Sequence, residues 1–328
     1  MASLKEIKQH ISAVRQTQKL TKAMNMVAAA KLRATQHKTE AYEEYADESG
    51  RLLHEIGKRS PILAERLYTP LKDSDKVLLV VVTSDRGLCG SFNFNVFQKA
   101  DKAILDARDR GLTPVVLPVG RKGRDYYKLR KVETVELRVP IEEKNAARGG
   151  DDPKKELIRP GYSFGVARGL ANCLIDCHMT GYKEVTLVYT SFASLNRHPV
   201  EVLPLLPLSG GGGAKDPEAP TGDQVVPAPA APDPDKGSLH SNLDYSIEPD
   251  AEELLKFLIP NSMAIGLYRA SLESVTAENA ARMQAMDNAS KSCHDIIQSL
   301  TMAFNKARQA SVTNELLDIV NGAEALKG

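Results

Sequence analysis

The stretch LKEIKQHISAV, residues 4–14, carries its apolar side chains at intervals of three, four and three residues. These side chains are Leu4, Ile7, Ile11 and Val14. Such spacing places them in one line along a helix and is typical of a coiled-coil seam. Because no proline lies between Ser3 and Ser60, residues 1–60 are predicted to form one helix. At the usual rise per residue this helix would be roughly 80 Å long.

A second long helix is predicted over residues 250–328, with an interruption at Pro260. In the first helix we expect the apolar stripe to shift in phase, to Leu20, Met24 and Val27. The second helix has a seam of its own at Cys293, Ile297, Leu300, Phe304, Ala307 and Ser311. Since neither helix can bury its stripe alone, the two are predicted to pair as an antiparallel coiled coil.

The centre of the chain has a different pattern. The run VLLVVVTS, residues 77–84, is continuously apolar and has the length of a buried strand. Helices and further strands are predicted to alternate after it, at 95–110, 113–120, 122–129, 132–139, 164–179 and 184–191. This alternation indicates a Rossmann-like α/β domain over residues 75–208 with a largely parallel sheet. The prolines within 200–208 place a strand there at the sheet edge.

Two segments are predicted to be irregular. Residues 141–160 contain Gly-Gly and Asp-Asp-Pro among charged side chains and are predicted to be a loop. Residues 209–240 are rich in glycine and proline, and such a composition predicts a disordered insertion. The insertion could act as a tether or brake, or it could be neutral.

The charge balance excludes a general nucleic-acid binder, because 43 basic residues face 42 acidic ones. Residues 1–38 are nevertheless basic, which fits either a solvated helix face or a surface for an acidic partner. The four scattered cysteines favour a reducing compartment over a disulfide scaffold. We expect no secretory signal and no membrane-spanning segment, so membrane association would require a partner.

Few residues suggest catalysis. Gly87-x-x-Gly90 follows the first strand, where α/β proteins bind phosphates, but it matches neither the dinucleotide nor the P-loop pattern. Cys173, Cys177 and His178 lack the spacing of a haem site, and the two cysteines are interpreted as small, buried hydrophobic side chains of a helix. We therefore expect no catalytic residue, no cofactor and no metal.

Three blocks resemble the gamma subunits of F-type ATP synthases. They are IKQHISAVRQTQKLTKAMNMVAAAKLR (7–33), SDRGLCGSFN (84–93) and ARMQAMDNASKSCHDIIQSLTMAFNKARQASVTNELLDIV (281–320). The resemblance implies a non-catalytic central rotor shaft that couples rotation of the c-ring to the cycling of the catalytic beta subunits. It implies one copy per complex, inside a head of alpha and beta subunits and beside the epsilon subunit. It also implies that the complex lies at the cytoplasmic face of the bacterial inner membrane and that this chain is attached to the membrane only through its partners.

The resemblance also implies the contact residues. Lys22 and Met24 resemble the region that faces an acidic lever of beta, and Arg282, Arg308, Gln309 and Thr313 resemble a polar set that contacts a loop of beta. Two other hypotheses remain beside the shaft: a nucleotide-dependent α/β enzyme, and a free-standing coiled-coil scaffold that forms a homodimer. The coupling ion is not indicated by this sequence.

Overall fold

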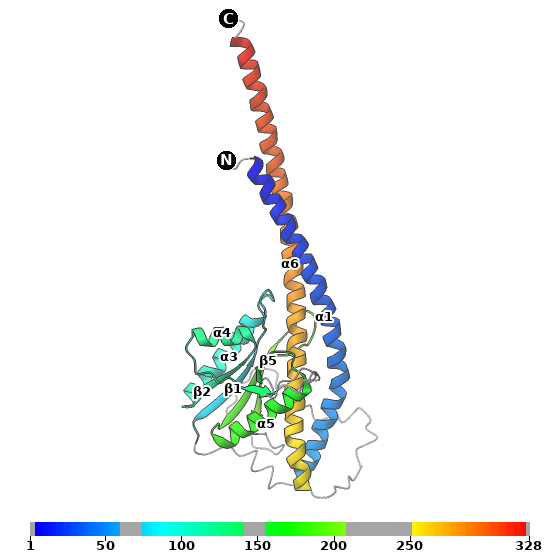
Figure 1. The fold of residues 1–328 in the computed structure, drawn as a ribbon, viewed down its shortest axis with the longest axis vertical. Helices are drawn as coiled ribbons and strands as arrows, with labels where there is room; N and C mark the ends of the chain where they lie inside the picture. Colours follow the sequence, from blue (N-terminus) through cyan, green and yellow to red (C-terminus); the bar gives the residue numbers. More distant parts are fainter. Residues whose placement is uncertain (1–3, 60–73, 141–154, 208–250, 326–328) are drawn as a thin grey trace, which may run out of the picture. The chain divides into compact units, whose positions relative to one another are not determined.

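The computed structural model describes residues 4–59, 74–140, 155–207 and 251–325 (Figure 1). The chain divides into two compact units. We call Met1–Leu32, Leu88–Gly90 and Asn279–Gly328 the helical unit, and Arg33–Gly87 with Ser91–Glu278 the α/β unit. Two long helices, α1 (Leu4–Arg59) and α6 (Ala251–Ala325), contribute to both units. The two predicted terminal helices are thereby confirmed, whereas the predicted insertion at 209–240 lies outside the described residues.

The α/β unit is built on a four-stranded sheet in the order β2-β1-β5-β6. Its strands are β1 (Lys76–Val82), β2 (Thr113–Val119), β5 (Glu184–Thr190) and β6 (Val200–Leu206). Strand β1 pairs in parallel with both β2 and β5, whereas β6 runs antiparallel to β5. The predicted largely parallel sheet is therefore confirmed, and β6, which contains Pro204, lies at an edge as expected.

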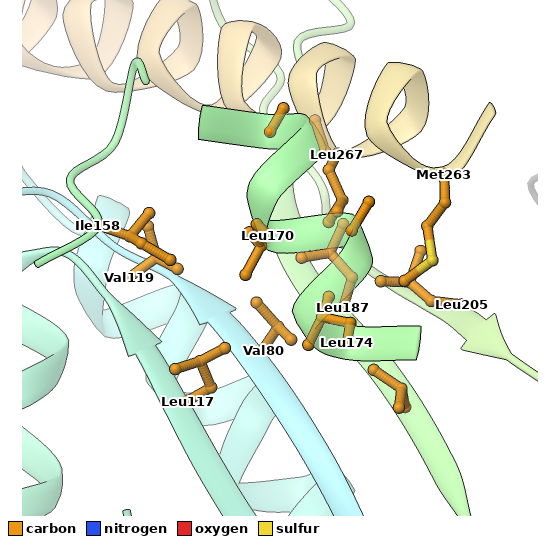
Figure 2. Packing of buried hydrophobic residues seen from close by; sticks show 14 of the residues in the cluster. Val80, Leu117, Val119, Ile158, Leu170, Leu174, Leu187, Leu205, Met263 and Leu267 are labelled. Carbon is orange, nitrogen blue, oxygen red and sulfur yellow. The ribbon is translucent and has the colours of Figure 1, made fainter. Parts of the chain in front are cut away.

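Side chains of β1 alternate between two hydrophobic clusters, because successive residues of a strand point to opposite faces. On one face, Val77, Leu79 and Val81 pack with helices α3 (Phe92–Asp109) and α4 (Arg121–Leu129). On the other face, the cluster combines Leu78, Val80 and Val82 with α5 (Phe164–Thr180) and with Met263 and Leu267 of α6 (Figure 2). The continuous apolar run of β1 is thus explained by burial on both faces.

The predicted strand at 132–139 is mostly wrong. Only Thr134 bridges Val116 of β2, and a short strand β3 (Arg138–Pro140) pairs with β4 (Lys155–Leu157) instead. The amide of Val116 points to the outer edge of β2, where it donates to the carbonyl of Glu133. By alternation the next outward positions are 114 and 118, and both are prolines without an N–H group. A longer ladder on this edge therefore lacks donors, and β4 lies where the sequence predicts a loop.

The predicted interruption at Pro260 is also wrong, since α6 passes through it. A proline inside a helix costs roughly 3 kcal/mol, because it removes one backbone hydrogen bond and crowds the preceding turn. Ile259 beside it is buried, as are Met263 and Leu267, which lie about one and two turns further along the helix. Each such side chain contributes about 2 kcal/mol on burial, so packing against the α/β unit offsets the cost of the proline.

In the helical unit, the seam of α1 keeps a regular heptad spacing and does not shift in phase. Its heptad positions, all buried or half-buried, are Leu4, Ile7, Ile11, Val14, Gln18, Thr21, Asn25, Ala28 and Leu32. Met24, which we predicted in the seam, is half-buried beside them, as is Ala29. Leu20 and Val27, which we predicted in the seam, are 62% and 57% exposed. Polar side chains therefore occupy the seam where apolar ones were expected. The predicted seam of α6 is confirmed, because Cys293 is buried and Ile297, Leu300 and Phe304 are half-buried.

Candidate functional site

Two side-chain hydrogen bonds set the register of α1 against α6 in the helical unit. The amide of Asn25 donates to the carbonyl of Met283 at 2.8 Å, and the amide of Gln18 donates to that of Ser290 at 3.4 Å. Seven residues back along α1 thus correspond to seven residues forward along α6, as antiparallel helices require. Each bond joins a side-chain amide of α1 to a main-chain carbonyl of α6. A shift in register would leave these amides without their partners in the seam, and an unsatisfied buried amide is costly.

This register sorts the predicted contact residues into two groups. Lys22, Met24 and Arg282 lie at one level of the helix pair, next to the bond between Asn25 and Met283. Lys22 is exposed, and Met24 and Arg282 are half-buried. Arg308, Gln309 and Thr313 are exposed on α6 roughly 40 Å further along the helix axis. The structure does not bring the two groups together, and their roles remain predictions.

Around the first group the outer face of α1 exposes both apolar and basic side chains. Leu20 and Val27 are seven residues apart and therefore share one face, and Met26 beside them is also exposed. Lysines 19, 22 and 31 are exposed on the same part of the helix. If the heptad pattern is continued through Gln18, Thr21 and Asn25, Leu20 and Val27 fall outside the seam. The sequence could therefore have indicated that these apolar side chains are exposed.

The turn after β1 adds another exposed apolar residue to the helical unit. Leu88 is exposed and adopts a left-handed backbone conformation with φ of 63°, which is uncommon for a residue other than glycine. Cys89 beside it is buried, and a Cβ atom at Gly90 would lie 3.8 Å from the Cβ of Ala285. The turn is therefore packed against α6, with Leu88 pointing into solvent.

In the part of the chain that the structure describes, the end of α6 has no part of α1 opposite it. Gln18 lies opposite Ser290, and when this register is continued to the start of α1, Leu4 lies opposite Phe304 of α6. Figure 1 shows the C-terminal end of α6, in red, running past the blue start of α1. Beyond Phe304 the helix exposes a set of large apolar side chains: Val312, Leu316, Leu317, Ile319 and Val320.

At the start of α4, which follows β2, the backbone amides are bound by oxygens from residues 83–85, directly after β1. The amides of the first three residues of α4, positions 121–123, donate to the carboxylate of Asp85, the carbonyl of Ser84 and the hydroxyl of Thr83. Free amides at a helix N-terminus are the groups that bind phosphate. Since protein oxygens already accept from these amides, the start of α4 offers none of its first three amides to a phosphate.

The cysteine pair on α5 is half-buried, and burial raises the pKa of both the Cys173 and the Cys177 thiol. The neighbouring His178 is buried, with Nδ1 2.9 Å from the carbonyl of Tyr182. No group of three possible metal ligands occurs among the described residues. Within the same residues, no helix has the length and apolar character to span a membrane.

The buried His178 is expected to make the stability of the α/β unit depend on pH. Burial lowers the pKa of His178 in the folded chain, and it also lowers the pKa of His198. The unfolded chain has an ordinary histidine pKa of about 6.5 and binds protons more readily, so stability is expected to fall as pH decreases from about 7 to 5. Urea unfolding across this range should show the loss, and the double variant His178→Gln/His198→Gln should flatten it. An unchanged slope in the double variant would contradict the assignment.

Comparison with known proteins covers the whole chain. Residues 3–326 match a family described as ATP synthase. The chain is 36% identical over 329 residues to the ATP synthase gamma chain of Desulfosudis oleivorans, with full coverage of both chains. It is 37% identical, again with full coverage of both, to the ATP synthase gamma chain of Nitratidesulfovibrio vulgaris.

The chain belongs to the ATP synthase gamma-chain family. Chains from solved structures of two mitochondrial ATP synthases share its fold. One, from the OSCP, F1 and c-ring structure of the Euglena gracilis enzyme, is 19% identical, with a TM-score of 0.59 and a match over 98% of this chain and 94% of that one. Another, from the central stalk and c-ring structure of Tetrahymena thermophila, is 24% identical, with a TM-score of 0.54 and a match over 83% of this chain and 99% of that one. The predicted fold and the resemblance of the three sequence blocks are thus confirmed.

Proposed function

We propose that this chain is the central rotor shaft of an F-type ATP synthase. It couples ion-driven rotation of a c-ring to the conformational cycle of catalytic beta subunits, and it works in reverse when ATP is hydrolysed. The observation that carries the proposal is the full-length similarity to ATP synthase gamma chains, combined with the unpaired apolar end of α6.

The unpaired end suits a shaft that turns inside a sleeve. Its exposed apolar side chains lie beyond the start of α1, so α1 does not cover them. Apolar contact is non-directional, and it can therefore hold a helix without favouring one angle of rotation. A sleeve formed by alpha and beta subunits would bury this surface while α6 turns. Arg308, Gln309 and Thr313 flank it and would contact a loop of beta.

The exposed face of α1 suits a second contact with beta. Leu20, Met26 and Val27 offer an apolar stripe, and the nearby lysines favour an acidic partner. Lys22, Met24 and Arg282 lie at this level and would meet the acidic lever of beta. Because a shaft must release each beta subunit in turn, contacts that differ between rotational states matter more than tight ones.

In this proposal the chain has no active site, and ATP chemistry takes place on beta. One copy joins a head of alpha and beta subunits, with the epsilon subunit and the c-ring at the α/β unit. The complex lies at the cytoplasmic face of the bacterial inner membrane, and the chain reaches the membrane only through its partners.

Reconstitution tests the proposal directly. The chain, with and without residues 309–328, is mixed with purified alpha and beta subunits, and assembly mass and ATPase activity are recorded. We expect one copy per hexameric head, ATPase activity that depends on the chain, and a severalfold loss in the truncated variant, since the truncation removes the apolar end.

Other outcomes would favour the other hypotheses. Saturable binding of ATP or NAD by the chain alone would support a nucleotide-dependent enzyme. A stable homodimer that does not join the head would support a free-standing scaffold.

A further inference from the structure

In the α/β unit, the two long helices are attached to the rest of the fold in different ways. Helix α6 contributes Met263, Ala264, Leu267 and Ala270 to a hydrophobic cluster on the sheet. Among the described residues, neither hydrophobic cluster contains a residue of α1. The attachment of α1 therefore depends on contacts outside these clusters.

One such attachment is aromatic. The ring of Tyr42 in α1 meets the ring of Tyr268 in α6 edge-on, with centroids 4.8 Å apart. Phe164, the first residue of α5, lies 6.2 Å from Tyr42 and 5.9 Å from Tyr268. The guanidinium of Arg168 lies over Phe164 at 5.4 Å. Three elements, one of them a helix of the α/β fold, thus meet at these three rings.

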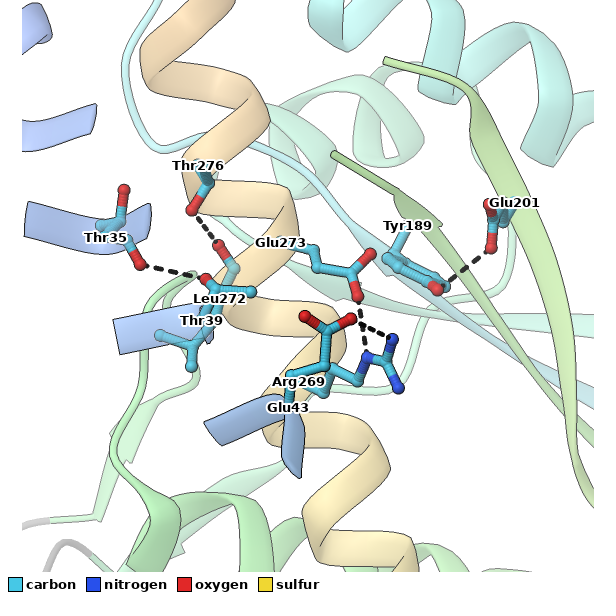
Figure 3. Close-up of polar contacts among 9 residues, drawn as sticks. All are labelled: Thr35, Thr39, Glu43, Tyr189, Glu201, Arg269, Leu272, Glu273 and Thr276. Atoms are coloured by element: carbon cyan, nitrogen blue, oxygen red, sulfur yellow. Dashed lines mark hydrogen bonds and ion pairs between the residues drawn. The ribbon is translucent and has the colours of Figure 1, made fainter. Parts of the chain in front are cut away.

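The residues next to the two tyrosines form a charged attachment (Figure 3). Arg269 of α6 donates through Nη2 to Glu43 of α1 at 3.2 Å and through Nε to Glu273 at 3.0 Å. Glu273 is buried, and burial of Tyr189 in β5, together with the charges of Glu273 and Glu201, raises the pKa of that tyrosine. The hydroxyl of Tyr189 donates to Glu201 of β6. Charge interactions therefore extend from α1 through α6 to the sheet.

The two attachments hold different sides of each helix. Successive residues of an α-helix are separated by about 100° around its axis. Tyr42 and Glu43 therefore face different directions from α1, and Tyr268 and Arg269 do so from α6. A single contact would act as a pivot, whereas two contacts about 100° apart oppose rotation of one helix about its axis relative to the other.

We propose that Tyr42, Glu43, Phe164, Tyr268, Arg269 and Glu273, which we call the junction, are the residues that pass torque between the α/β fold and α1. The inference rests on the proposed rotor function. Torque that enters through the α/β fold reaches α6 through the hydrophobic cluster, and within the α/β unit it reaches α1 through the junction, before the two helices pair in the seam. With the junction weakened, α1 would turn partly independently of the fold, and the rotor would become softer in torsion.

The test measures torsional stiffness in the assembled complex. The head is immobilised, and a bead is attached to α4 through Leu129→Cys, an 85% exposed position, with Cys173 and Cys177 replaced by alanine. In the stalled rotor the angular variance of the bead is inversely proportional to stiffness. The junction variant Tyr42→Leu/Glu43→Gln weakens both attachments and leaves the contact between Arg269 and Glu273 in place. Arg110→Gln is the matched control, because it removes a two-point ion pair with Glu184 inside the α/β fold.

We expect the angular variance to rise roughly twofold in the junction variant and to stay at the wild-type value in the control. ATP synthesis driven by an ion gradient should fall about fivefold, whereas ATP hydrolysis by the detached head with this chain should change less than about twofold. Unchanged variance in the junction variant, or an equal rise in the control, would overturn the inference. A loss of synthesis and hydrolysis in equal proportion would indicate a purely structural role and would also overturn it. If the wild-type chain neither joins the head nor rotates, the proposed rotor function itself fails.

Discussion

Replacing Gly120 with alanine is expected to lower the free energy of unfolding of the α/β unit by about 4 kcal/mol. Gly120 precedes α4 and has a backbone φ of 102°. Residues other than glycine rarely adopt such a positive φ. A Cβ atom there would collide with the main-chain carbonyl oxygen of Thr83. Since that oxygen belongs to the backbone at the end of a buried strand, it cannot rotate away as a flexible side chain could.

The collision would also disturb a buried polar arrangement. The hydroxyl of Thr83 donates to the carbonyl of Val119 at 3.0 Å and accepts from the amide of Gly123 at 2.9 Å. Moving Thr83 to make room would weaken both hydrogen bonds in a buried setting, where an unsatisfied group costs about 1–3 kcal/mol.

Gly111→Ala is the matched control for this prediction. Gly111 also has a positive φ, of 75°, but the methyl group of an alanine there would have no atom of the described chain within 4 Å beyond its immediate neighbours in sequence. The control therefore isolates the backbone penalty, which is about 1 kcal/mol. Urea unfolding of both variants, followed by circular dichroism, provides the comparison. Equal losses in the two variants would show that the close approach to Thr83 contributes nothing.

The sheet could be predicted from the sequence because its determinants are local. Strand β1 is a continuous apolar run, and burial on both faces requires such a run. The missing strand at 132–139 could not be predicted in the same way. Its own alternating pattern is favourable, and what prevents pairing is a pair of prolines on the outward edge of β2, in another part of the chain. Which edge carries these prolines is known only once β1 and β2 are paired.

The seam of α1 shows a different limit. From apolar spacing alone we predicted Leu20 and Val27 in the seam, because that method assumes that apolar residues fill a seam. The structure places Gln18 and Asn25 there, where their amides bind carbonyls of α6. A polar residue in a seam can fix the register of a helix pair at some cost in stability. The apolar side chains left outside then become available to a partner, which a search for a hydrophobic core would not reveal.

The contact residues had to come from family resemblance. Nothing in the spacing of Arg308, Gln309 and Thr313 distinguishes them from an ordinary exposed helix face. The structure adds that they lie on an unpaired stretch of α6, next to exposed apolar residues. These surroundings are a reason to mutate them, and their roles stay predictions.

Leucine-to-alanine substitutions at two places on α6, Leu267 and the pair Leu316 and Leu317, should have opposite consequences. Leu267 is 0% exposed within the hydrophobic cluster on the sheet, and Leu316 is 57% exposed on the unpaired end. Leu267→Ala is expected to cost about 3–4 kcal/mol of unfolding free energy, because it leaves a cavity between α6 and the sheet. Leu316→Ala/Leu317→Ala should change the stability of the isolated chain by less than about 0.5 kcal/mol.

Assembly should reverse this order of effects. If a sleeve of alpha and beta subunits covers the end of α6, truncating two leucines removes apolar contacts worth about 1.4 kcal/mol or more, which is at least a tenfold loss of affinity for the head. Leu267 lies against the sheet, so any Leu267→Ala chain that folds should join the head with unchanged affinity. Thermal unfolding of the free chains and titration of the head with each variant separate the two effects. Wild-type affinity in the Leu316→Ala/Leu317→Ala variant would show that the apolar end of α6 is not what the head recognises, and the contact would then have to be sought on the outer face of α1.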